Sequence, residues 1–208
     1  MFLPKIYPIT DTRIAKISHV AQVEKLIEGG ATFIQLREKY ASPEDFYEAA
    51  QLALEYARKR GVKIIINDRV DIALALKADG VHLGQDDLPP EEARKILGGK
   101  AIIGFSTHNL EQAIHAAKLP VDYLAIGPIY ATATKKNPDQ TIGLEGIRTV
   151  GKAVGDFPLV AVGGINYRNL PEIFESGADS AAIISDLIGE PDKITQQMRL
   201  YLNRDPNL

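Results

Sequence analysis

Short apolar runs alternate with longer amphipathic stretches along the whole of this 208-residue chain. The runs are rich in Ile, Val and Leu, which is typical of strands that are buried on both faces of a parallel sheet. Neighbouring parallel strands need a crossover connection, usually a helix, so the alternation predicts repeated strand–helix units. The runs lie at residues 5–10, 33–39, 63–68, 80–84, 101–106, 123–128, 158–165 and 180–185.

The stretches between the runs have helical spacing. In residues 43–60 the apolar side chains recur on one helical face, and Ser42 followed by Pro43 predicts an N-cap with proline at the first helical position. Asn109 is predicted to cap the helix that follows it. Glycines stand where the helices should end before the next strand, at positions 29–30, 61, 98–99, 155 and 177.

A weak internal repeat supports the alternation. Residues 30–32 (GAT), 78–80 (ADG), 121–122 (VD) and 177–179 (GAD) precede the second, fourth, sixth and eighth runs, which suggests a duplicated strand–helix unit. Eight such units in about 200 residues correspond to the lower size limit of a (β/α)8 barrel. We therefore predict an α/β protein with a single TIM barrel domain over residues 1–208. An open doubly wound sheet is the structural alternative.

Charge and cysteine content narrow the function. A net charge of -3 at pH 7 gives no reason to expect nucleic acid or an anionic membrane as a partner, so a local basic cluster must hold any anionic ligand. The absence of cysteine excludes disulfides, a thiolate nucleophile and thiolate metal sites. We see neither a signal peptide nor an apolar run of membrane-spanning length, so a cytoplasmic protein is expected. The oligomeric state stays open, a homo-oligomer included.

Polar residues interrupt the apolar runs at their carboxyl ends, which form the active-site face of such barrels. Every run except the first ends in this way. The residues concerned are Gln35, Arg37 and Lys39, then Asn67 and Asp68, Gln85 to Asp87, Ser106, the group Thr132, Thr134 and Lys135, the pair Gly163 and Gly164, and Ser185.

Gln35, Arg37 and Lys39 are spaced two apart, so they are predicted to project from one face of a strand. They could alternate outward against the helices or face the wet mouth of the barrel. Unpaired cations buried against helices would be costly. We therefore interpret the three residues as an anion-binding site at the mouth.

Asp68 and Asp87 end neighbouring strands. Two carboxylates that converge beside basic residues indicate a magnesium ion that bridges to phosphate oxygens. The alternative is that each aspartate pairs with a cation such as Arg69 or caps the next helix. We favour this alternative for Asp86, and the metal for Asp68 together with Asp87.

Two other segments predict phosphate contacts. Gly163-Gly164 and the Ser185-Asp186 turn follow the last two strands, where barrels often bind phosphate through backbone N–H groups, although glycine pairs also serve simply as turns. The longest loop, residues 130–143, is polar and carries two lysines, 135 and 136. It is either a phosphate-gripping lid or a solvated insertion.

We assign no essential role to the four histidines. His82 and His108 lie near the predicted mouth, but a lone histidine is more often a packed or hydrogen-bonding residue. His19 and His115 fall on predicted helices and are expected at the surface.

The motifs of this sequence, in their order along the chain, resemble those of the thiamine-phosphate synthase family over nearly the whole length. VGGI and GAD are shared by many phosphate-binding barrels, whereas the ordered set of QLREK, ND, GQDD and TxTK is far more specific. Ala131 departs from a frequent proline of the family, and Asp186 departs from a common small residue. The matching segments are YPITD (7–11), QLREK (35–39), NDR-DIAL (67–74), ADGVHLGQDD (78–87), GFSTH (104–108), GPIYATATKK (127–136), VGGI (162–165) and GADSAAIIS (177–185).

The resemblance implies an enzyme that condenses 4-amino-2-methyl-5-(diphosphooxymethyl)pyrimidine with 4-methyl-5-(2-phosphooxyethyl)thiazole, with Mg2+ as cofactor. It implies that the pyrimidine pyrophosphate is held by Gln35, Leu36, Arg37, Glu38, Lys39, Asn67, Ser106 and Lys135. The implied thiazole phosphate site consists of Thr132, Ala133, Thr134, Gly164, Ile184 and Ser185. Asp68 and Asp87 would hold the metal. The working residues would be Arg37, Lys39, Lys135 and Ser106.

The implied reaction displaces pyrophosphate from the pyrimidine methylene carbon by the thiazole ring nitrogen. That nitrogen already has a free lone pair, so no general base and no nucleophile–base pair are expected. Departure of the charged leaving group is the difficult step, and electrostatic stabilisation is the expected catalysis. The rivals are a thiazole tautomerase-like isomerase and a non-catalytic regulator of the same fold.

Overall fold

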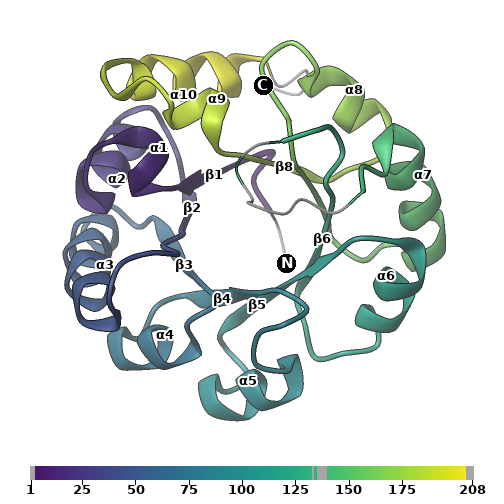
Figure 1. The fold of residues 1–208 in the computed structure, drawn as a ribbon, viewed down its shortest axis with the longest axis horizontal. Coiled ribbons are helices and arrows are strands. Elements are labelled where there is room, and N and C mark those ends of the chain that lie inside the picture. The colour runs from purple at the N-terminus through teal and green to yellow at the C-terminus, as the bar shows by residue number, and fades with distance from the viewer. Residues whose placement is uncertain (1–2, 133, 135–139, 205–208) are drawn as a thin grey trace.

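The computed structural model describes residues 3–132, 134 and 140–204. Its strands form a closed barrel in which each strand pairs in parallel with the next along the chain and the last pairs with the first. Figure 1 shows the helices as a ring around these strands. The TIM barrel prediction is confirmed. The strands are β1 Ile6–Thr10, β2 Phe33–Leu36, β3 Lys63–Asn67, β4 Gly80–Leu83, β5 Ile102–Thr107, β6 Tyr123–Ile126, β7 Leu159–Val162 and β8 Ser180–Ile183.

Two helices begin where the sequence predicts. The side chain of Ser42 accepts a hydrogen bond from the Asp45 backbone at 3.1 Å, and that of Asn109 accepts one from Gln112 at 2.9 Å, so both predicted caps are confirmed. The helices are α1 Thr12–Ala15, α2 His19–Glu28, α3 Pro43–Arg58, α4 Val70–Leu76, α5 Pro90–Leu97, α6 Leu110–Ala116, α7 Gly143–Val154, α8 Leu170–Glu175, α9 Ser185–Ile188, the short 3-10 helix η1 Pro191–Lys193 and α10 Ile194–Asn203.

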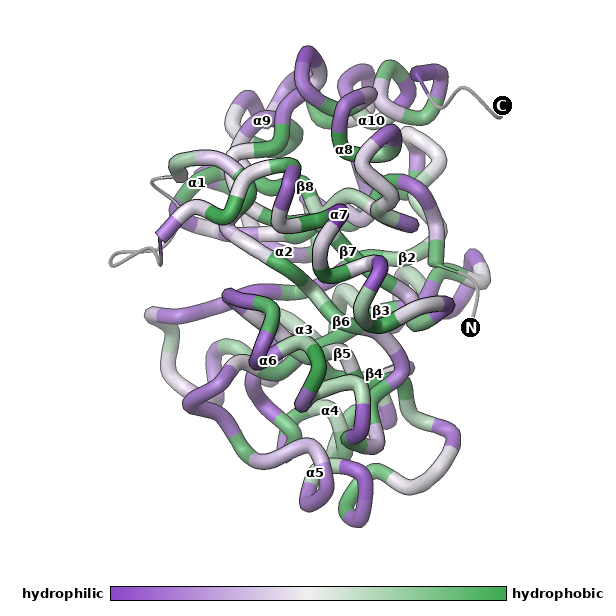
Figure 2. The backbone as a smooth tube through the Cα atoms, turned by 90° about the vertical axis from the view of Figure 1, so that its right-hand side faces the viewer, coloured by the Kyte–Doolittle hydropathy of each residue, from purple (hydrophilic) through white to green (hydrophobic). Residues whose placement is uncertain are grey.

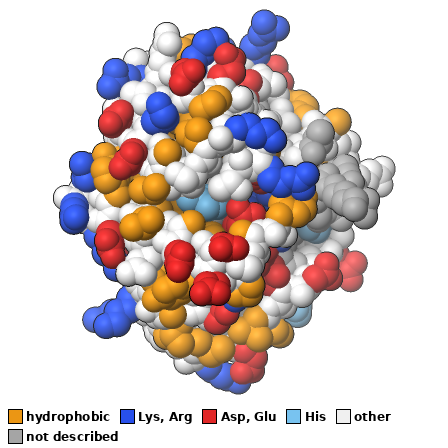
Figure 3. Space-filling view, turned by 60° about the vertical axis from the view of Figure 1, so that its left-hand side comes forward, with side chains coloured by type: hydrophobic (Ala, Val, Ile, Leu, Met, Phe, Trp, Pro, Cys, Tyr) orange, Lys and Arg blue, Asp and Glu red, His pale blue; other side chains and the backbone are white. Residues whose placement is uncertain are grey.

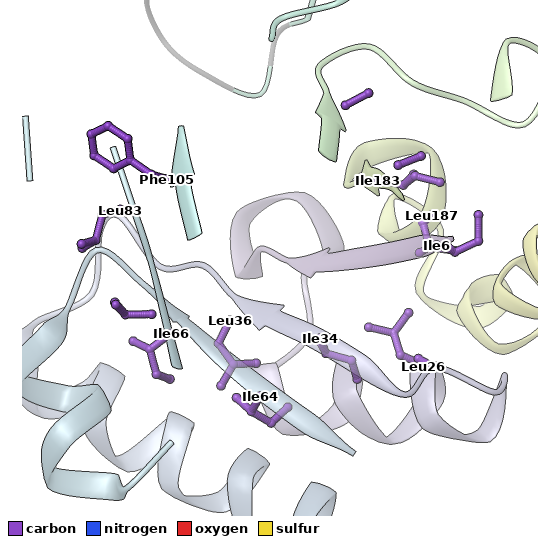
Figure 4. Close-up of a cluster of buried hydrophobic side chains, with 14 of the residues drawn as sticks. Ile6, Leu26, Ile34, Leu36, Ile64, Ile66, Leu83, Phe105, Ile183 and Leu187 are labelled. Carbon is purple, nitrogen blue, oxygen red and sulfur yellow. The ribbon is translucent and has the colours of Figure 1, made fainter. Parts of the chain in front are cut away.

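The core has two layers. The larger layer lies between the strands and the helices, and Figure 4 shows part of it, with Ile34, Leu36, Ile64 and Ile66 among the labelled side chains. The smaller layer fills the barrel interior. Because side chains alternate along a strand, one strand supplies both layers. Figure 2 shows hydrophobic residues along the strands and hydrophilic ones on the outer turns and loops. The inner layer comprises Leu3, Tyr7, Ile9, Phe33, Ile65, Tyr123, Ala125, Val160 and Ala182.

The acidic residues of the internal repeat have a structural purpose. Each stands just before an even-numbered strand, and its carboxylate accepts a hydrogen bond from a backbone N–H at the start of the preceding strand. A barrel whose strands are staggered leaves such N–H groups without a ladder partner, and the carboxylate satisfies them. The pairs are Asp79 with Ile64 (2.8 Å), Asp122 with Ile103 (2.7 Å) and Asp179 with Leu159 (2.8 Å).

Two local predictions are wrong. The second run was expected to extend to Lys39, but β2 ends at Leu36, because the following residues turn around the carboxylate of Glu38 and leave the ladder. His19 was expected at the surface, but it is 1% exposed. Its Nδ1 lies 2.8 Å from Thr10 Oγ1, at the first turn of α2, where that helix packs on the barrel.

No helix in the described ranges is both long enough and apolar enough to cross a membrane.

Candidate active site

A cavity of about 620 Å³ opens at the carboxyl ends of the strands, and residues from all eight strands line it. Polar and charged side chains face it from β2 through β5, whereas Ala125, Val160, Val162 and Ala182 make its other wall apolar. In Figure 3 acidic, basic and histidine side chains gather around a depression in the surface. The cavity is therefore polar on one side and apolar on the other.

Most of the predicted site residues meet in this cavity, although they come from distant parts of the chain. Leu36 and Glu38 do not line it, and Ala133 and Lys135 lie outside the described residues. The predicted residues that line it are Gln35, Arg37, Lys39, Asn67, Asp68, Asp87, Ser106, Thr132, Thr134, Gly164, Ile184 and Ser185.

Leu36 and Glu38 point away from the cavity because side chains alternate along the segment. Leu36 is fully buried in the layer between strands and helices. The Glu38 carboxylate accepts hydrogen bonds from the backbone N–H groups of Lys39, Tyr40 and Ala41, and its other oxygen accepts from Thr12 at 2.7 Å. Burial raises the pKa of Glu38, but these donors outweigh burial and lower it overall.

Glu38 thus shapes the loop that carries Lys39. We predict that Glu38→Ala raises roughly tenfold the KM for the pyrimidine pyrophosphate that the resemblance implies as a substrate, since the loop loses the acceptor for three N–H groups. The KM for the thiazole phosphate should change much less. Initial rates with each substrate varied in turn measure the effect, and Glu48→Ala, at an exposed position on α3, is the control. Equal KM values in Glu38→Ala and the wild type would contradict this role.

Among the described residues Arg37 and Lys39 are the cations that line the cavity, and each is held by an aspartate. Arg37 Nη1 donates to Asp11 Oδ2 at 2.5 Å, while Asp11 Oδ1 caps α1. The Lys39 ammonium forms an ion pair with Asp68. Arg37 is mostly buried, so its aspartate partner offsets the desolvation of the guanidinium and fixes its direction.

Asp68 and Asp87 approach each other across β3 and β4. Burial raises the pKa of Asp68, Lys39 lowers it, and the neighbouring Asp87 raises it, with a net upward shift. The backbone of Asp68 has a left-handed φ of 62°, and its N–H donates to the carbonyl of His82 on β4 at 2.8 Å. Asp87 Oδ2 accepts from the Gly84 N–H at 2.7 Å. Two carboxylates are thereby held together in one place.

The expected cap or ion pair of Asp86 is not found among the described residues. The N-cap of α5 is Pro89, with no side-chain hydrogen bond, and Asp86 lines the cavity. The described ranges also contain no group of three or more His, Asp or Glu side chains placed to hold a metal. A pair of carboxylates is nevertheless what Mg2+ commonly takes from a protein, with substrate phosphates and water completing its shell.

Asn67 offers the cavity an unused donor. Its Nδ2 is buried and has no hydrogen-bond partner in the described part of the chain, although the residue lines the cavity. An unsatisfied buried amide costs free energy unless a ligand accepts its hydrogen bond. The cavity therefore offers a hydrogen-bond donor to an acceptor atom of a ligand at this point.

The glycine pair after β7 is required by close packing. A Cβ on Gly163 would lie 2.7 Å from Pro128 Cα, and one on Gly164 would lie 2.7 Å from the Ala131 carbonyl oxygen. Both glycines have positive φ, 102° and 63°, which side chains rarely permit. The pair brings the backbone of this loop to the cavity wall.

Asp186 does not bring a charge into the cavity. Its carboxylate accepts hydrogen bonds from the Tyr201 hydroxyl and, at 3.1 Å, from the Tyr167 N–H, and it is not among the lining residues. The departure at Asp186 from a common small residue therefore adds no anion beside the predicted phosphate contacts, because a tyrosine of α10 holds its carboxylate outside the cavity.

The sequence prediction missed a buried hydrogen-bond chain across the cavity floor. Tyr7 and Tyr123 hydroxyls lie 2.9 Å apart, Gln35 Nε2 lies 2.9 Å from Tyr7, and His82 Nδ1 lies 2.9 Å from Tyr123. His82 Nε2 then meets Ser106 Oγ at 2.8 Å. The available signal was the presence of polar residues at inward positions of strands that are otherwise apolar.

Ser106 and His82 therefore form a hydroxyl–imidazole pair, although no nucleophile–base pair was expected from the sequence. The third member is a tyrosine hydroxyl where a triad would have a carboxylate. Burial lowers the pKa of His82 to about 4, and the nearby Asp87 only partly offsets this. An imidazole that weakly basic is poorly suited to activate a serine at neutral pH.

The buried His82 also predicts a pH dependence of stability. Its pKa is about 4 in the folded protein against 6.5 unfolded, so the unfolded state binds more protons between these values and stability falls as pH falls. From pH 7 to 5 the loss from His82 is about 2 kcal/mol. Urea unfolding at both pH values should show a smaller loss for His82→Gln than for the wild type. His115→Gln, at an exposed position, should keep the wild-type loss.

Comparison with known proteins gives consistent matches. The family model described as "Thiamine monophosphate synthase" matches residues 6–187. A thiamine-phosphate synthase of Chloroflexus aurantiacus is 44% identical over 189 residues, which cover 90% of this chain and 87% of that protein. One of Syntrophomonas wolfei is 45% identical over 188 residues, 90% of each chain.

Solved structures agree with the sequence matches. A thiamine phosphate pyrophosphorylase from Pyrococcus furiosus superposes with a TM-score of 0.84 at 38% identity, covering 96% of this chain and 95% of that one. A phosphoribosyl anthranilate isomerase from Thermotoga maritima has a TM-score of 0.67 at 15% identity and shares the fold alone.

Proposed function

This chain belongs to the thiamine-phosphate synthase family, and on that premise we propose that its cavity joins the pyrimidine pyrophosphate to the thiazole phosphate. The family activity is a transfer of an alkyl group in thiamine biosynthesis. The pyrimidinylmethyl carbon leaves the pyrophosphate oxygen and bonds to the thiazole ring nitrogen. The products are thiamine phosphate and pyrophosphate.

The observation that carries the proposal is the collection of charges on one side of the cavity. Arg37, Lys39 and the Asn67 amide, whose nitrogen has no partner within the described ranges, face the same space as Asp68 and Asp87. Donors and cations beside a carboxylate pair suit a diphosphate with a divalent ion. The apolar wall opposite suits the faces of two heterocycles.

The residues fit Mg2+. Both metal ligands would be carboxylates, which Mg2+ prefers. Burial and the neighbouring Asp87 raise the pKa of Asp68, and a bound divalent cation would offset both of these causes. In the proposal Asp68 and Asp87 hold the ion, which neutralises charge on the leaving pyrophosphate when bound. Lys39 would then be free to turn from Asp68 towards the same phosphate oxygens.

Catalysis by the chain is electrostatic in this proposal. The thiazole nitrogen has a lone pair and needs no base, so the barrier lies in breaking the bond from the methylene carbon to the pyrophosphate oxygen. Arg37 and Lys39 stabilise the charge that grows on that oxygen, and the Asn67 amide donates to the diphosphate. Lys135 is proposed to act with them, from outside the described residues. The shared cavity orients the two rings.

The thiazole phosphate is proposed to bind at the opposite rim. Its contacts would come from Thr132 to Thr134, from the Gly164 backbone and from Ile184 and Ser185. The close approach of the glycine loop to the cavity wall supports this placement, since backbone N–H groups there can reach a phosphate.

The test is an assay of the purified protein with both substrates and MgCl2, in which chromatography follows thiamine phosphate and a coupled assay follows pyrophosphate. We expect equal amounts of both products, only when both substrates are present, and a loss of turnover with EDTA that MgCl2 restores. Rearrangement of the thiazole phosphate without consumption of the pyrimidine would identify an isomerase. Binding of the substrates without any product would identify a regulator.

A further inference from the structure

The buried hydrogen-bond chain that runs through side chains from Gln35 to Ser106 links two groups that face the cavity. Its inner members are Tyr7, Tyr123 and His82, which are 1%, 0% and 8% exposed. Each of the four contacts is 2.8 or 2.9 Å long. Both ends reach the ligand space, because Gln35 and Ser106 line the cavity.

Packing holds the inner members in place. The Tyr123 ring lies against β5 at Gly104, where a Cβ would come within 2.0 Å of the ring. His82 stacks on Tyr123 at a centroid distance of 5.5 Å, and Tyr7 meets Phe33 edge-on at 4.8 Å. The rings cannot turn to other partners without disturbing the inner core.

Counting the available protons shows which atom is the donor in each bond of the hydrogen-bond chain. Gln35 Nε2 donates to the Tyr7 hydroxyl, and the single buried proton of Tyr7 needs an acceptor, which among the described residues is the Tyr123 oxygen. Tyr123 must then donate to His82 Nδ1, which leaves the one ring proton of an uncharged His82 on Nε2, facing Ser106. The hydroxyl proton of Ser106 is therefore left for the cavity.

The same count leaves the carbonyl oxygen of Gln35 as an acceptor. Among the described residues no donor is bonded to Gln35 Oε1, and one of the two N–H groups of its amide is engaged by Tyr7. One end of the chain thus offers an acceptor and the other end a donor. Neither end can reverse alone, because each inner hydroxyl has only one proton to give.

We infer that Tyr7, Tyr123 and His82 are positioning residues that fix Ser106 as a donor and Gln35 as an acceptor towards the pyrimidine ring. The inference rests on the proposed function for the identity of the ligand. A 4-aminopyrimidine carries an amine donor and ring-nitrogen acceptors, which complement this pattern. A 4-oxo pyrimidine, in its lactam form, carries a carbonyl and a ring N–H, so it would meet the pattern with like groups. The buried hydrogen-bond chain therefore selects the 4-aminopyrimidine ring against the 4-oxo ring.

The first test measures the direction without any substrate. In protein labelled with 15N-histidine, long-range proton–nitrogen spectra assign the tautomer of each imidazole. We expect His82 with the proton on Nε2 in the wild type and in Tyr7→Phe, because in Tyr7→Phe His82 Nδ1 is the one acceptor among the described residues that is left for the buried Tyr123 proton. In Tyr123→Phe we expect signals of both tautomers. A wild-type His82 protonated on Nδ1 would overturn the inference, and so would a single unchanged tautomer in Tyr123→Phe.

The second test measures selectivity. Tyr123→Phe is expected to raise the KM for the pyrimidine pyrophosphate roughly 10- to 100-fold, the cost of one mispaired buried donor, and to leave the KM for the thiazole phosphate within about twofold. Preference for the 4-amino over the 4-oxo substrate should fall by about tenfold or more in the same variant. A uniform loss of kcat with unchanged preference would indicate a purely structural role and reject the inference.

The two tests separate this inference from the proposed function. A wild-type Nε2–H tautomer without coupling activity would leave the direction of the chain standing and reject the function. Coupling activity together with an Nδ1–H tautomer in the wild type would support the proposed function and reject the direction of the hydrogen-bond chain. Should Tyr123→Phe fail to fold, as judged by circular dichroism, the wild-type spectrum still decides the direction.

Discussion

Asp68→Asn is expected to lower kcat by roughly 100- to 1,000-fold, the scale seen when one charge-stabilising contact is removed from an active site. The change keeps the shape of the side chain and removes the charge that would hold Mg2+ beside the diphosphate. Turnover at rising MgCl2 concentrations should show a higher half-saturating concentration as well as a lower maximum.

The same substitution should leave the fold intact. Because the pKa of Asp68 is raised in the folded protein, its ionised form lowers stability at neutral pH, and that cost disappears as pH falls or when the charge is removed. The thermal midpoint of metal-free Asp68→Asn should therefore be equal to or above that of the wild type. Asp71→Asn is the matched control, since Asp71 lies three residues on and pairs with Arg69 at the surface. Wild-type turnover in Asp68→Asn would remove Asp68 from the proposed metal site.

Arg37→Ala is the second substitution with a large expected effect. Arg37 brings a permanent charge and a planar fork of donors to the cavity, held in direction by Asp11. We expect kcat/KM for the pyrimidine pyrophosphate to fall roughly 100- to 1,000-fold, again by the scale of a lost charge contact. Arg37→Lys should recover only part of this loss, because an ammonium cannot reproduce the two-pronged geometry.

Guanidinium in the assay buffer tests whether the effect is local. If Arg37 acts on the leaving group directly, millimolar guanidinium should restore part of the turnover of Arg37→Ala and none of that of Asp68→Asn. Arg69→Ala, at a surface ion pair, should behave like the wild type in both assays. An Arg37→Ala enzyme with wild-type kcat/KM would show that the guanidinium serves only its ion pair with Asp11.

The fold could be predicted because its signals are local. Buried parallel strands need continuous apolar runs, and the helices between them need caps and one apolar face, so the alternation, Ser42 and Asn109 were sufficient to predict the barrel. The ends of elements were less predictable. The run that contains Gln35 continued to Lys39 in sequence, but the strand stops at Leu36 because the Glu38 carboxylate competes for the backbone N–H groups.

The candidate site was predictable to the extent that barrel topology brings strand ends together. Polar residues after β2, β3, β4 and β5 had to meet at one mouth once the strands closed in order. Their partners were not predictable. The ion pairs of Arg37 with Asp11 and of Lys39 with Asp68, and the removal of Asp186 from the cavity by Tyr201, depend on distances between elements that sequence spacing does not report.

The sequence by itself determined the alternating architecture, the face on which the polar residues gather and the family to which their motifs point. Only the tertiary structure decided which of those residues face the cavity and how they are paired. It also revealed the buried chain through Tyr7, Tyr123 and His82, whose members are 41 to 116 residues apart where they touch each other. The physical reason is that apolar periodicity is set by neighbours along the chain, whereas hydrogen-bond direction and charge pairing arise only when distant strands close around a common interior.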